Sequence, residues 1–395
     1  MRRETFTLSQ KELQRVSVIS ACIKGDMACA SAAELLCLSV RQIKRLKKRM
    51  REDGEAALAH ANRGRPNPRR LPERTRQTAL RLARTKYAGF NDHHLAEKLN
   101  EVEGLSLSRE TLRRLLRQEG YGSPRKRRAP AHRQRRLRSA RLGELVQLDG
   151  SPHDWLEGRG PHLTALGMQD DATGKILAAQ FFLSESAEGY FHLLQRLLRR
   201  FGVPTAFYGD RSGIFVRNDP HWSLEEELAG QRHPTQFGRA LSQLGITFIA
   251  AQSPQAKGRV ERLWGVLQDR LTSELRLAQA ADIDSANAVL RKFIVDYNRR
   301  FARKPREIET AWRPVPESLD RICCFVHERI VSNDNVVQWE GRRFQIPQQA
   351  RRFSFAGARI QLCQALDGRI SLYYGDTRLK HTNSPGGDIF TLPLG

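Results

Sequence analysis

Three carboxylates stand where predicted secondary-structure elements end or begin in the middle of the chain. An apolar strand pattern over 144–149 ends in Asp149, and another over 205–208 is followed by Asp210. A third strand pattern, 246–250, leads into a helix whose first turn carries Glu261. Strands and helices that alternate in this way predict an α/β domain in which the acidic side chains emerge at the edges of buried elements.

The helix that carries Glu261 is amphipathic. Its apolar residues recur at three- and four-residue spacing and predict one buried stripe: Val260, Leu263, Trp264, Leu267, Leu271 and Leu275. At about 100° per residue, Glu261 lies roughly a quarter-turn from the centre of that stripe. Taken alone, the stretch is better explained as an ordinary helix with a solvated glutamate. The two aspartates are what favour a functional site.

Carboxylates delivered to one place by two strands and a helix suit a two-metal phosphoryl-transfer site. Mg²⁺ prefers oxygen ligands in a near-octahedral shell at about 2.1 Å. Two such ions, about 3.5–4 Å apart, can hold the attacking and leaving oxygens of an in-line displacement. We therefore predict that Asp149, Asp210 and Glu261 are the catalytic residues and ligate two Mg²⁺ ions, for which Mn²⁺ can substitute.

The sequence around these carboxylates resembles that of an ISNCY-type insertion-sequence transposase, and the three are similar to the DDE triad of retroviral-integrase and transposase cores. The resemblance is carried by 147–155 (QLDGSPHDW), 170–174 (DDATG) and 253–261 (SPQAKGRVE). It is strongest from about residue 140 to 305. It implies an RNase H-like core with a mixed five-stranded sheet. It also implies a polynucleotidyl transferase that cleaves insertion-sequence ends and integrates them into target DNA.

The resemblance departs from the wider family in one spacing. The three carboxylates are separated by 61 and 51 positions (210 − 149 and 261 − 210). The second gap is longer than is usual, and we predict that the polar run 218–233 is an insertion. Two alternatives stay open: an RNase H-like nuclease or resolvase without strand transfer, and a non-catalytic DNA-binding regulator derived from a transposase. Three intact carboxylates argue against the regulator.

Composition independently requires a polyanionic partner. The chain has 395 residues, a net charge of +24 and a pI near 10.5. Lys and Arg in such excess favour nucleic acid, here double-stranded DNA: the element's own terminal inverted repeats and the target. No apolar run approaches the ~20 residues of a membrane-spanning helix. We expect a bacterial cytoplasmic protein, associated with the nucleoid, that acts as a dimer or higher homo-oligomer on DNA.

Six segments are predicted from the composition shifts and periodicities along the chain. They are a helix-turn-helix domain (1–60), a basic Pro/Gly linker (61–71), a second helix-turn-helix domain (72–120), an Arg-rich linker (121–142), the catalytic core (143–305) and a small all-β barrel (306–395). The tail is predicted to contain hairpins at its Glu-Gly and Asp-Gly turns. Its role, in DNA contact or protomer contact, stays open.

Lys and Arg side chains that lie outside the apolar stripes of the predicted elements are predicted to contact DNA. In the helix 39–49 they face away from the inner stripe of Val40, Ile43 and Leu46, and this helix is the predicted reader of the first module. Other cations lie in the basic Pro/Gly segment 61–71, which is equally well explained as an extended arm suited to a minor groove or as a plain linker. Further ones lie in the second module, the Arg-rich linker and the stretch before Glu261. The predicted DNA contacts are Arg41, Lys44, Arg45, Lys48, Arg63, Arg65, Arg109, Arg113, Arg125, Lys126, Arg127, Arg128, Gln255, Lys257 and Arg259.

Other acidic residues of the core have simpler explanations than metal binding. Asp170 and Asp171 precede a turn, where aspartate more often caps backbone groups. The run 225–227 (EEE) is predicted to be a solvated helical face.

Overall fold

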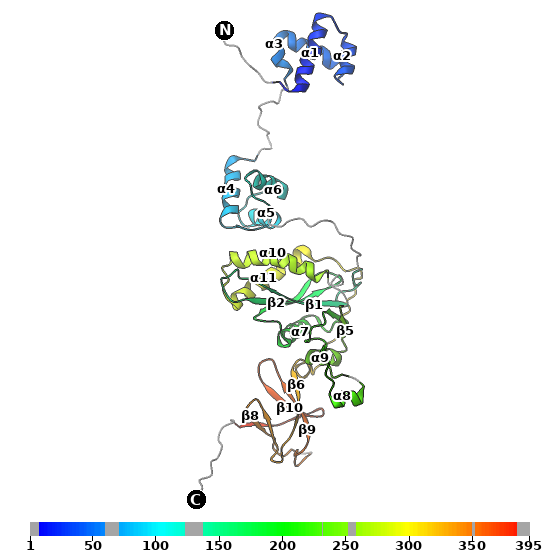
Figure 1. The fold of residues 1–395 in the computed structure, drawn as a ribbon, viewed down its shortest axis with the longest axis vertical. Helices are drawn as coiled ribbons and strands as arrows, with labels where there is room; N and C mark the ends of the chain where they lie inside the picture. Colours follow the sequence, from blue (N-terminus) through cyan, green and yellow to red (C-terminus); the bar gives the residue numbers. More distant parts are fainter. Residues whose placement is uncertain are drawn as a thin grey trace. The chain divides into compact units, whose positions relative to one another are not determined.

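The computed structural model describes residues 8–59, 71–122, 137–230, 232–251, 258–349 and 352–384 (Figure 1). Two compact units divide the chain, Met1–Arg76 and Gln77–Gly395.

The first unit is a small helical domain. It contains α1 (Gln10–Lys24), α2 (Cys29–Leu35) and α3 (Val40–Asp53), followed by a short 3-10 turn, Glu55–Leu58. The Ser39 hydroxyl caps α3 by accepting a hydrogen bond from the Gln42 backbone N–H over 3.2 Å. Ile43 and Leu46 are buried as predicted, but Val40 is 41% exposed because the buried stripe starts one turn into the helix.

The second helical module repeats this plan with α4 (Glu73–Arg84), α5 (Asp92–Glu101) and α6 (Arg109–Gln118). Asn91 caps α5 and Ser108 caps α6, each by accepting backbone N–H groups of the first turn. The inner face of α6 is buried as predicted: Leu112, Leu115 and Leu116. The all-α character of both modules is confirmed.

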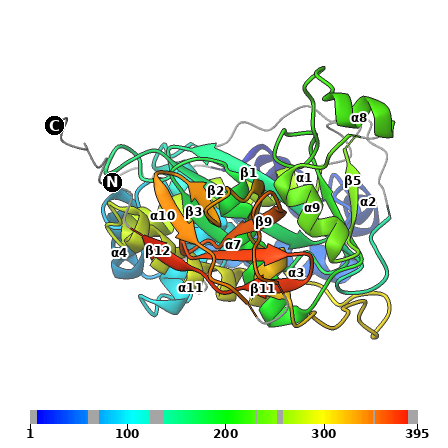
Figure 2. The same cartoon turned by 90° about the horizontal axis from the view of Figure 1, so that it is seen from below.

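A mixed five-stranded sheet forms the centre of the second unit. Its order is β3-β2-β1-β4-β5. Its strands are β1 (Leu145–His153), β2 (Leu163–Asp170), β3 (Ile176–Phe182), β4 (Ala206–Gly209) and β5 (Thr247–Ala250). The first three form an antiparallel meander, and β4 and β5 run parallel to β1. The edge strand β5 lies beside α9 (Gln236–Gln243) (Figure 2).

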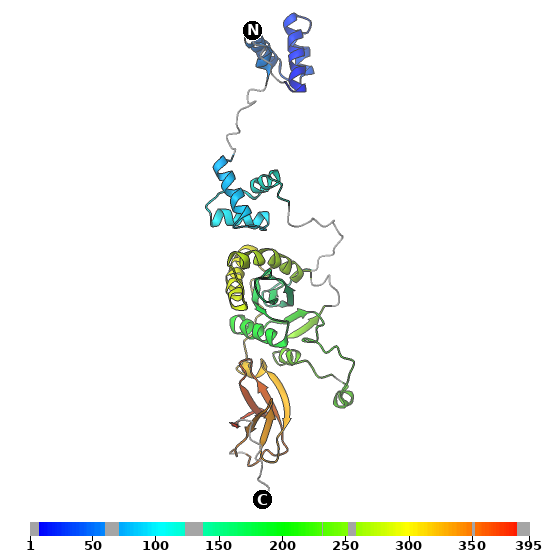
Figure 3. The ribbon, with the colours of Figure 1, turned by 60° about the vertical axis from the view of Figure 1, so that its left-hand side comes forward.

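Helices cover both faces of this sheet. On one face α7 (Ala187–Phe201) and α9 pack against Val146 and Leu148 of β1. On the other, α10 (Val260–Leu277) and α11 (Ile283–Phe301) pack against Leu163 and Ala165 (Figure 3). A mixed sheet between two helical layers, in this strand order, is the RNase H-like arrangement that the sequence implied, and that prediction is confirmed.

Two predictions about this core are wrong in detail. Strand β1 does not end at Asp149 but continues to His153, because β2 keeps pairing with it after its pairing with β4 has ended at Gln147 and Tyr208. Pro152 is tolerated there because that part of β1 has a neighbour on one side only. In α8 (Leu224–Ala229) Glu226 is fully buried rather than solvated. It accepts hydrogen bonds from backbone N–H groups and pairs with Arg217.

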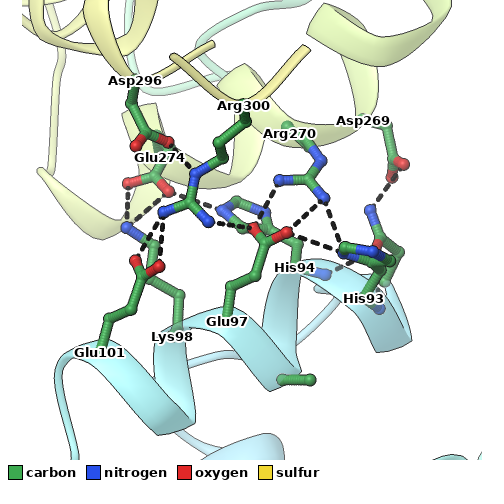
Figure 4. A network of polar contacts seen from close by, with 12 residues as sticks. His93, His94, Glu97, Lys98, Glu101, Asp269, Arg270, Glu274, Asp296 and Arg300 are labelled. Atoms are coloured by element: carbon green, nitrogen blue, oxygen red, sulfur yellow. Dashed lines mark hydrogen bonds and ion pairs between the residues drawn. The ribbon is translucent and has the colours of Figure 1, made fainter. Parts of the chain in front are cut away.

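Polar contacts join the second helical module to the core, with α5 facing α10 and α11 (Figure 4). Arg270 of α10 pairs with Glu97 at 2.7 Å, and Arg300 of α11 pairs with Glu101 at 2.6 Å. Nε2 of His94 lies 2.7 Å from Oε1 of Glu274. These charged residues of α5 are therefore paired with opposite charges on α10 and α11.

The C-terminal part is all-β, as predicted. After α12 (Leu319–Ile322), a four-stranded sheet contains β6 (Phe325–Ile330), β9 (Arg359–Gln364), β10 (Ile370–Tyr374) and β11 (Thr377–Leu379). A three-stranded sheet contains β7 (Val336–Trp339), β8 (Arg342–Gln345) and β12 (Thr382–Ser384). One apolar core joins them. The β7–β8 hairpin turns at Glu340 and Gly341, both at positive φ, as the Glu-Gly signal predicted.

Candidate active site

Asp149 and Asp210 each lie two residues beyond the last paired positions of two neighbouring parallel strands, Gln147 and Tyr208. The paired residues of β1 and β4, from Leu145↔Ala206 to Gln147↔Tyr208, keep an offset of 61 (206 − 145). The two aspartates have the same offset (210 − 149 = 61). Continued by two residues, this register would place the two aspartates on adjacent strands, which lie about 4.8 Å apart in a sheet. Both residues are half-buried, and Asp210 accepts the Ser212 backbone N–H over 3.0 Å.

Helix α10 is tied to the first of these aspartates. Nε1 of Trp264 donates a hydrogen bond to Oδ2 of Asp149 over 3.0 Å. The indole fits because Gly167 lies opposite Asp149 in β2, where an added Cβ would lie 3.0 Å from the Trp264 ring. Glu261 is exposed in the first turn of α10, three residues before Trp264. Residues three apart are neighbours on a helix surface, so Glu261 adjoins Trp264, although Glu261 is exposed and Trp264 is buried.

The donor set of these three residues suits a hard divalent cation, because all its members are carboxylates. Within the described residues, no group of three or more His, Cys, Asp or Glu side chains is gathered closely enough to hold a metal ion. Asp149 and Asp210 thus follow neighbouring strands and Glu261 lies on the adjoining helix, but the three carboxylates are not gathered into one cluster.

Glu185 is a fourth acidic residue at this end of the sheet, and sequence reasoning missed it. The buried phenol of Tyr190 donates to Oε1 of Glu185 over 2.7 Å. An added Cβ at Gly150 would lie 2.7 Å from Oε2 of Glu185, so the carboxylate rests against the backbone next to Asp149. Burial and the charge of Glu185 raise the pKa of Tyr190. The charges of Asp149 and Asp210 raise this pKa further, because these carboxylates share one neighbourhood with the phenol.

Asp170 caps a turn, as predicted. Its carboxylate accepts the backbone N–H of Thr173 at 2.7 Å and that of Gly143 at 3.0 Å. Burial raises the pKa of Asp170, and these hydrogen bonds oppose the rise. Asp171 differs, because its buried carboxylate pairs with Arg259, a residue predicted to contact DNA.

The remaining predicted DNA contacts divide into exposed and undescribed residues. Arg41, Lys44, Arg45 and Lys48 are exposed along α3. Arg109 and Arg113 are exposed on α6, where Arg113 pairs with Glu110 at 2.8 Å. The others lie outside the described residues: Arg63, Arg65, Arg125, Lys126, Arg127, Arg128, Gln255 and Lys257.

Comparison with known sequences agrees with this architecture. The winged helix-turn-helix family model matches residues 15–77. A protein named as a candidate transposase, y4bF of Sinorhizobium fredii, is 39% identical over 370 residues, which cover 93% of this chain and 79% of the relative. The transposase for insertion sequence IS1202 of Streptococcus pneumoniae is 29% identical over 410 residues, covering 94% of this chain and 86% of the relative.

Solved structures of similar chains include retroviral integrase cores. The catalytic core of BIV integrase has a TM-score of 0.30 and 19% identity, and it covers 40% of this chain and 85% of its own. The HTLV-2 integrase core in complex with magnesium (trimeric form) has a TM-score of 0.29 and 16% identity, covering 39% and 86%. With scores this low, the assignment rests on the sequence relatives.

A helix-turn-helix region, an RNase H-like core and these relatives define an enzyme of the polynucleotidyl-transferase type. The chain belongs to the transposase family. Over the described ranges, no helix is both long and apolar enough to cross a membrane.

Proposed function

We propose that this transposase cleaves the ends of its element and joins them to target DNA in a Mg²⁺-dependent reaction, with Asp149, Asp210 and Glu261 as the catalytic triad. When bound, two Mg²⁺ ions supply Lewis-acid stabilisation of the charge on the reacting phosphate. Water is the nucleophile for cleavage, and the freed 3′-OH is the nucleophile for joining. No covalent protein–DNA intermediate is required.

The observation that carries this proposal is the parallel register of β1 and β4, whose last paired residues, Gln147 and Tyr208, each lie two residues before one of the aspartates. The hydrogen bond from Trp264 to Asp149 supports it, because that bond holds the helix of Glu261 against the same strand. Charge supports it too, since a chain of net charge +24 attracts the polyanionic substrate.

We further propose that the helical modules 1–60 and 72–120 recognise the terminal inverted repeats. The exposed cations of α3 and α6 support this, since both helices turn a cationic face to solvent. Two ends must be joined in one event, so we propose that the active form is a homo-oligomer on DNA.

The test uses the full chain and duplexes made from the DNA that flanks the gene. Asp149→Asn, Asp210→Asn and Glu261→Gln should each abolish Mg²⁺-dependent cleavage and joining while binding to the duplex persists. Asp154→Asn is the matched control, because Asp154 accepts the Gly158 backbone N–H at 3.1 Å and should be dispensable. Joining by Glu261→Gln at the wild-type rate would refute the triad. Cleavage without joining by the wild type would favour the nuclease.

A further inference from the structure

Asp171 joins three segments through one buried carboxylate. Its side chain is 0% exposed. Oδ1 accepts a hydrogen bond from Nε2 of Gln147 over 2.5 Å and pairs with the Arg259 guanidinium. Oδ2 accepts the backbone N–H of Ser139 at 2.9 Å and its hydroxyl at 3.2 Å. The carboxylate is thus occupied on both oxygens by groups from distant parts of the chain.

Each of these partners stands next to a functional segment. Gln147 is fully buried in β1, two residues before Asp149. Arg259 directly precedes α10, two residues before Glu261. Ser139 belongs to the end of the predicted Arg-rich linker, 121–142. The strand of one proposed metal ligand and the helix of another therefore meet at Asp171.

Over the part of the chain that the structure describes, the first turn of α10 lacks a side-chain cap, so the ion pair between Asp171 and Arg259 matters there. Arg259 is the N-cap residue, in a helical conformation, and makes no side-chain capping bond among the described residues. A helix start without a side-chain cap lacks a common source of stability and frays more readily. The buried ion pair supplies the missing restraint, because separating it would leave an uncompensated charge inside the protein.

We propose that Asp171 is a positioning residue that, through Arg259, fixes Glu261 relative to Asp149. This inference rests on the proposed function of the triad. It also gives Arg259 a different role from direct DNA contact: its side chain is only 16% exposed, and its guanidinium is directed at Asp171.

The test compares metal binding by full-length variants, measured by Mn²⁺ electron paramagnetic resonance without DNA. Asp171→Asn and Arg259→Ala should each raise the half-saturating Mn²⁺ concentration about 10–100-fold, as expected when a partner that orients a metal ligand is removed. Glu157→Gln is the matched control, because Glu157 pairs with Arg276 at 2.7 Å at the opposite end of the same helix. It should bind Mn²⁺ like the wild type.

Two further measurements separate a positioning role of Arg259 from direct phosphate contact, and either of these from a wrong triad assignment. Arg259→Ala should leave the slope of log K against log salt for DNA binding unchanged, whereas removal of a phosphate-binding cation would lower it by about 0.9. Wild-type Mn²⁺ affinity in Arg259→Ala, or a lowered salt slope, would overturn the positioning role. If Asp171→Asn does not fold, Arg259→Ala alone decides. Glu261→Gln is measured alongside: wild-type Mn²⁺ binding and cleavage in that variant would refute the triad instead.

Discussion

Nε1 of Trp264 lies 3.0 Å from Oδ2 of Asp149, so a helix side chain donates directly to a proposed metal ligand. The outer ring atoms of Trp264, Cζ2 and Cη2, lie beside Gly167, so the indole has a packing role. Its N–H has a second role. It satisfies one carboxylate oxygen and fixes the orientation of Asp149 for the site.

Trp264→Phe removes the N–H donor together with part of a buried ring. We expect the free energy of unfolding to fall by at least about 1.5–3 kcal/mol, the range for hydrogen bonds to charged groups, because lost packing adds to it. Cleavage at saturating Mg²⁺ should fall as well, because Asp149 loses its fixed orientation. Urea unfolding and single-turnover cleavage measure the two effects. Unchanged cleavage alongside lowered stability would mean that the bond is only structural.

Gly150→Ala tests whether the carboxylate of Glu185 must rest against β1. The new methyl group would lie 2.7 Å from Oε2 of Glu185 and must displace it. We expect slower cleavage with little change in DNA binding. Gly265→Ala in α10 is the control, since its methyl group would meet no described atom within 4 Å. An alanine in that helix should stabilise the protein by about 0.5–1 kcal/mol. Equal cleavage rates of the two variants would show that the position of Glu185 does not affect the reaction.

Acid should weaken the contact between α5 and the core. Burial acts to raise the pKa of Glu274, but hydrogen bonds from His94 and Lys98 prevail, so its pKa is lowered from 4.5. A carboxylate with a lowered folded-state pKa contributes stability above its unfolded pKa and loses it as pH falls through the folded value. Wild type should therefore exceed Glu274→Gln in free energy of unfolding at pH 6. The difference should shrink below pH 4.5. A difference that stays constant down to pH 3 would contradict the ion pair.

Local patterns predicted the fold well, and long-range polar contacts were beyond them. The stripe of α10 and the strands around Asp149 and Asp210 follow from periodicity, which needs only neighbouring residues. The pairing of Arg259 with Asp171 joins positions 88 residues apart, and no periodicity marks it. Glu185 lies in a loop before α7, so nothing local distinguished it from a solvated residue. Glu226 was misassigned although a local signal marks it: it forms a capping box with Ser223 at the start of α8, and Arg217 and His233 complete its burial.

The four cations at 125–128 of the Arg-rich linker should act through phosphates alone. They carry no apolar periodicity and so have no core to build. Replacing Arg125, Lys126, Arg127 and Arg128 by alanine should weaken binding to all DNA sequences alike. The slope of log K against log salt should flatten by about 0.9 for each phosphate that is no longer neutralised, or roughly 3–4 in total. Base preference should not change, because phosphate contacts position a protein without reading sequence.

Titrations of cognate and scrambled ends across a salt series would decide this last point. The competing hypothesis is that the linker folds on the terminal repeats as an arginine-rich reader of sequence. Under that hypothesis the same four substitutions would erase the preference for cognate ends and leave the salt slope in place. Folding offers a further check, because a segment that builds no core should leave the urea midpoint of the full chain unchanged.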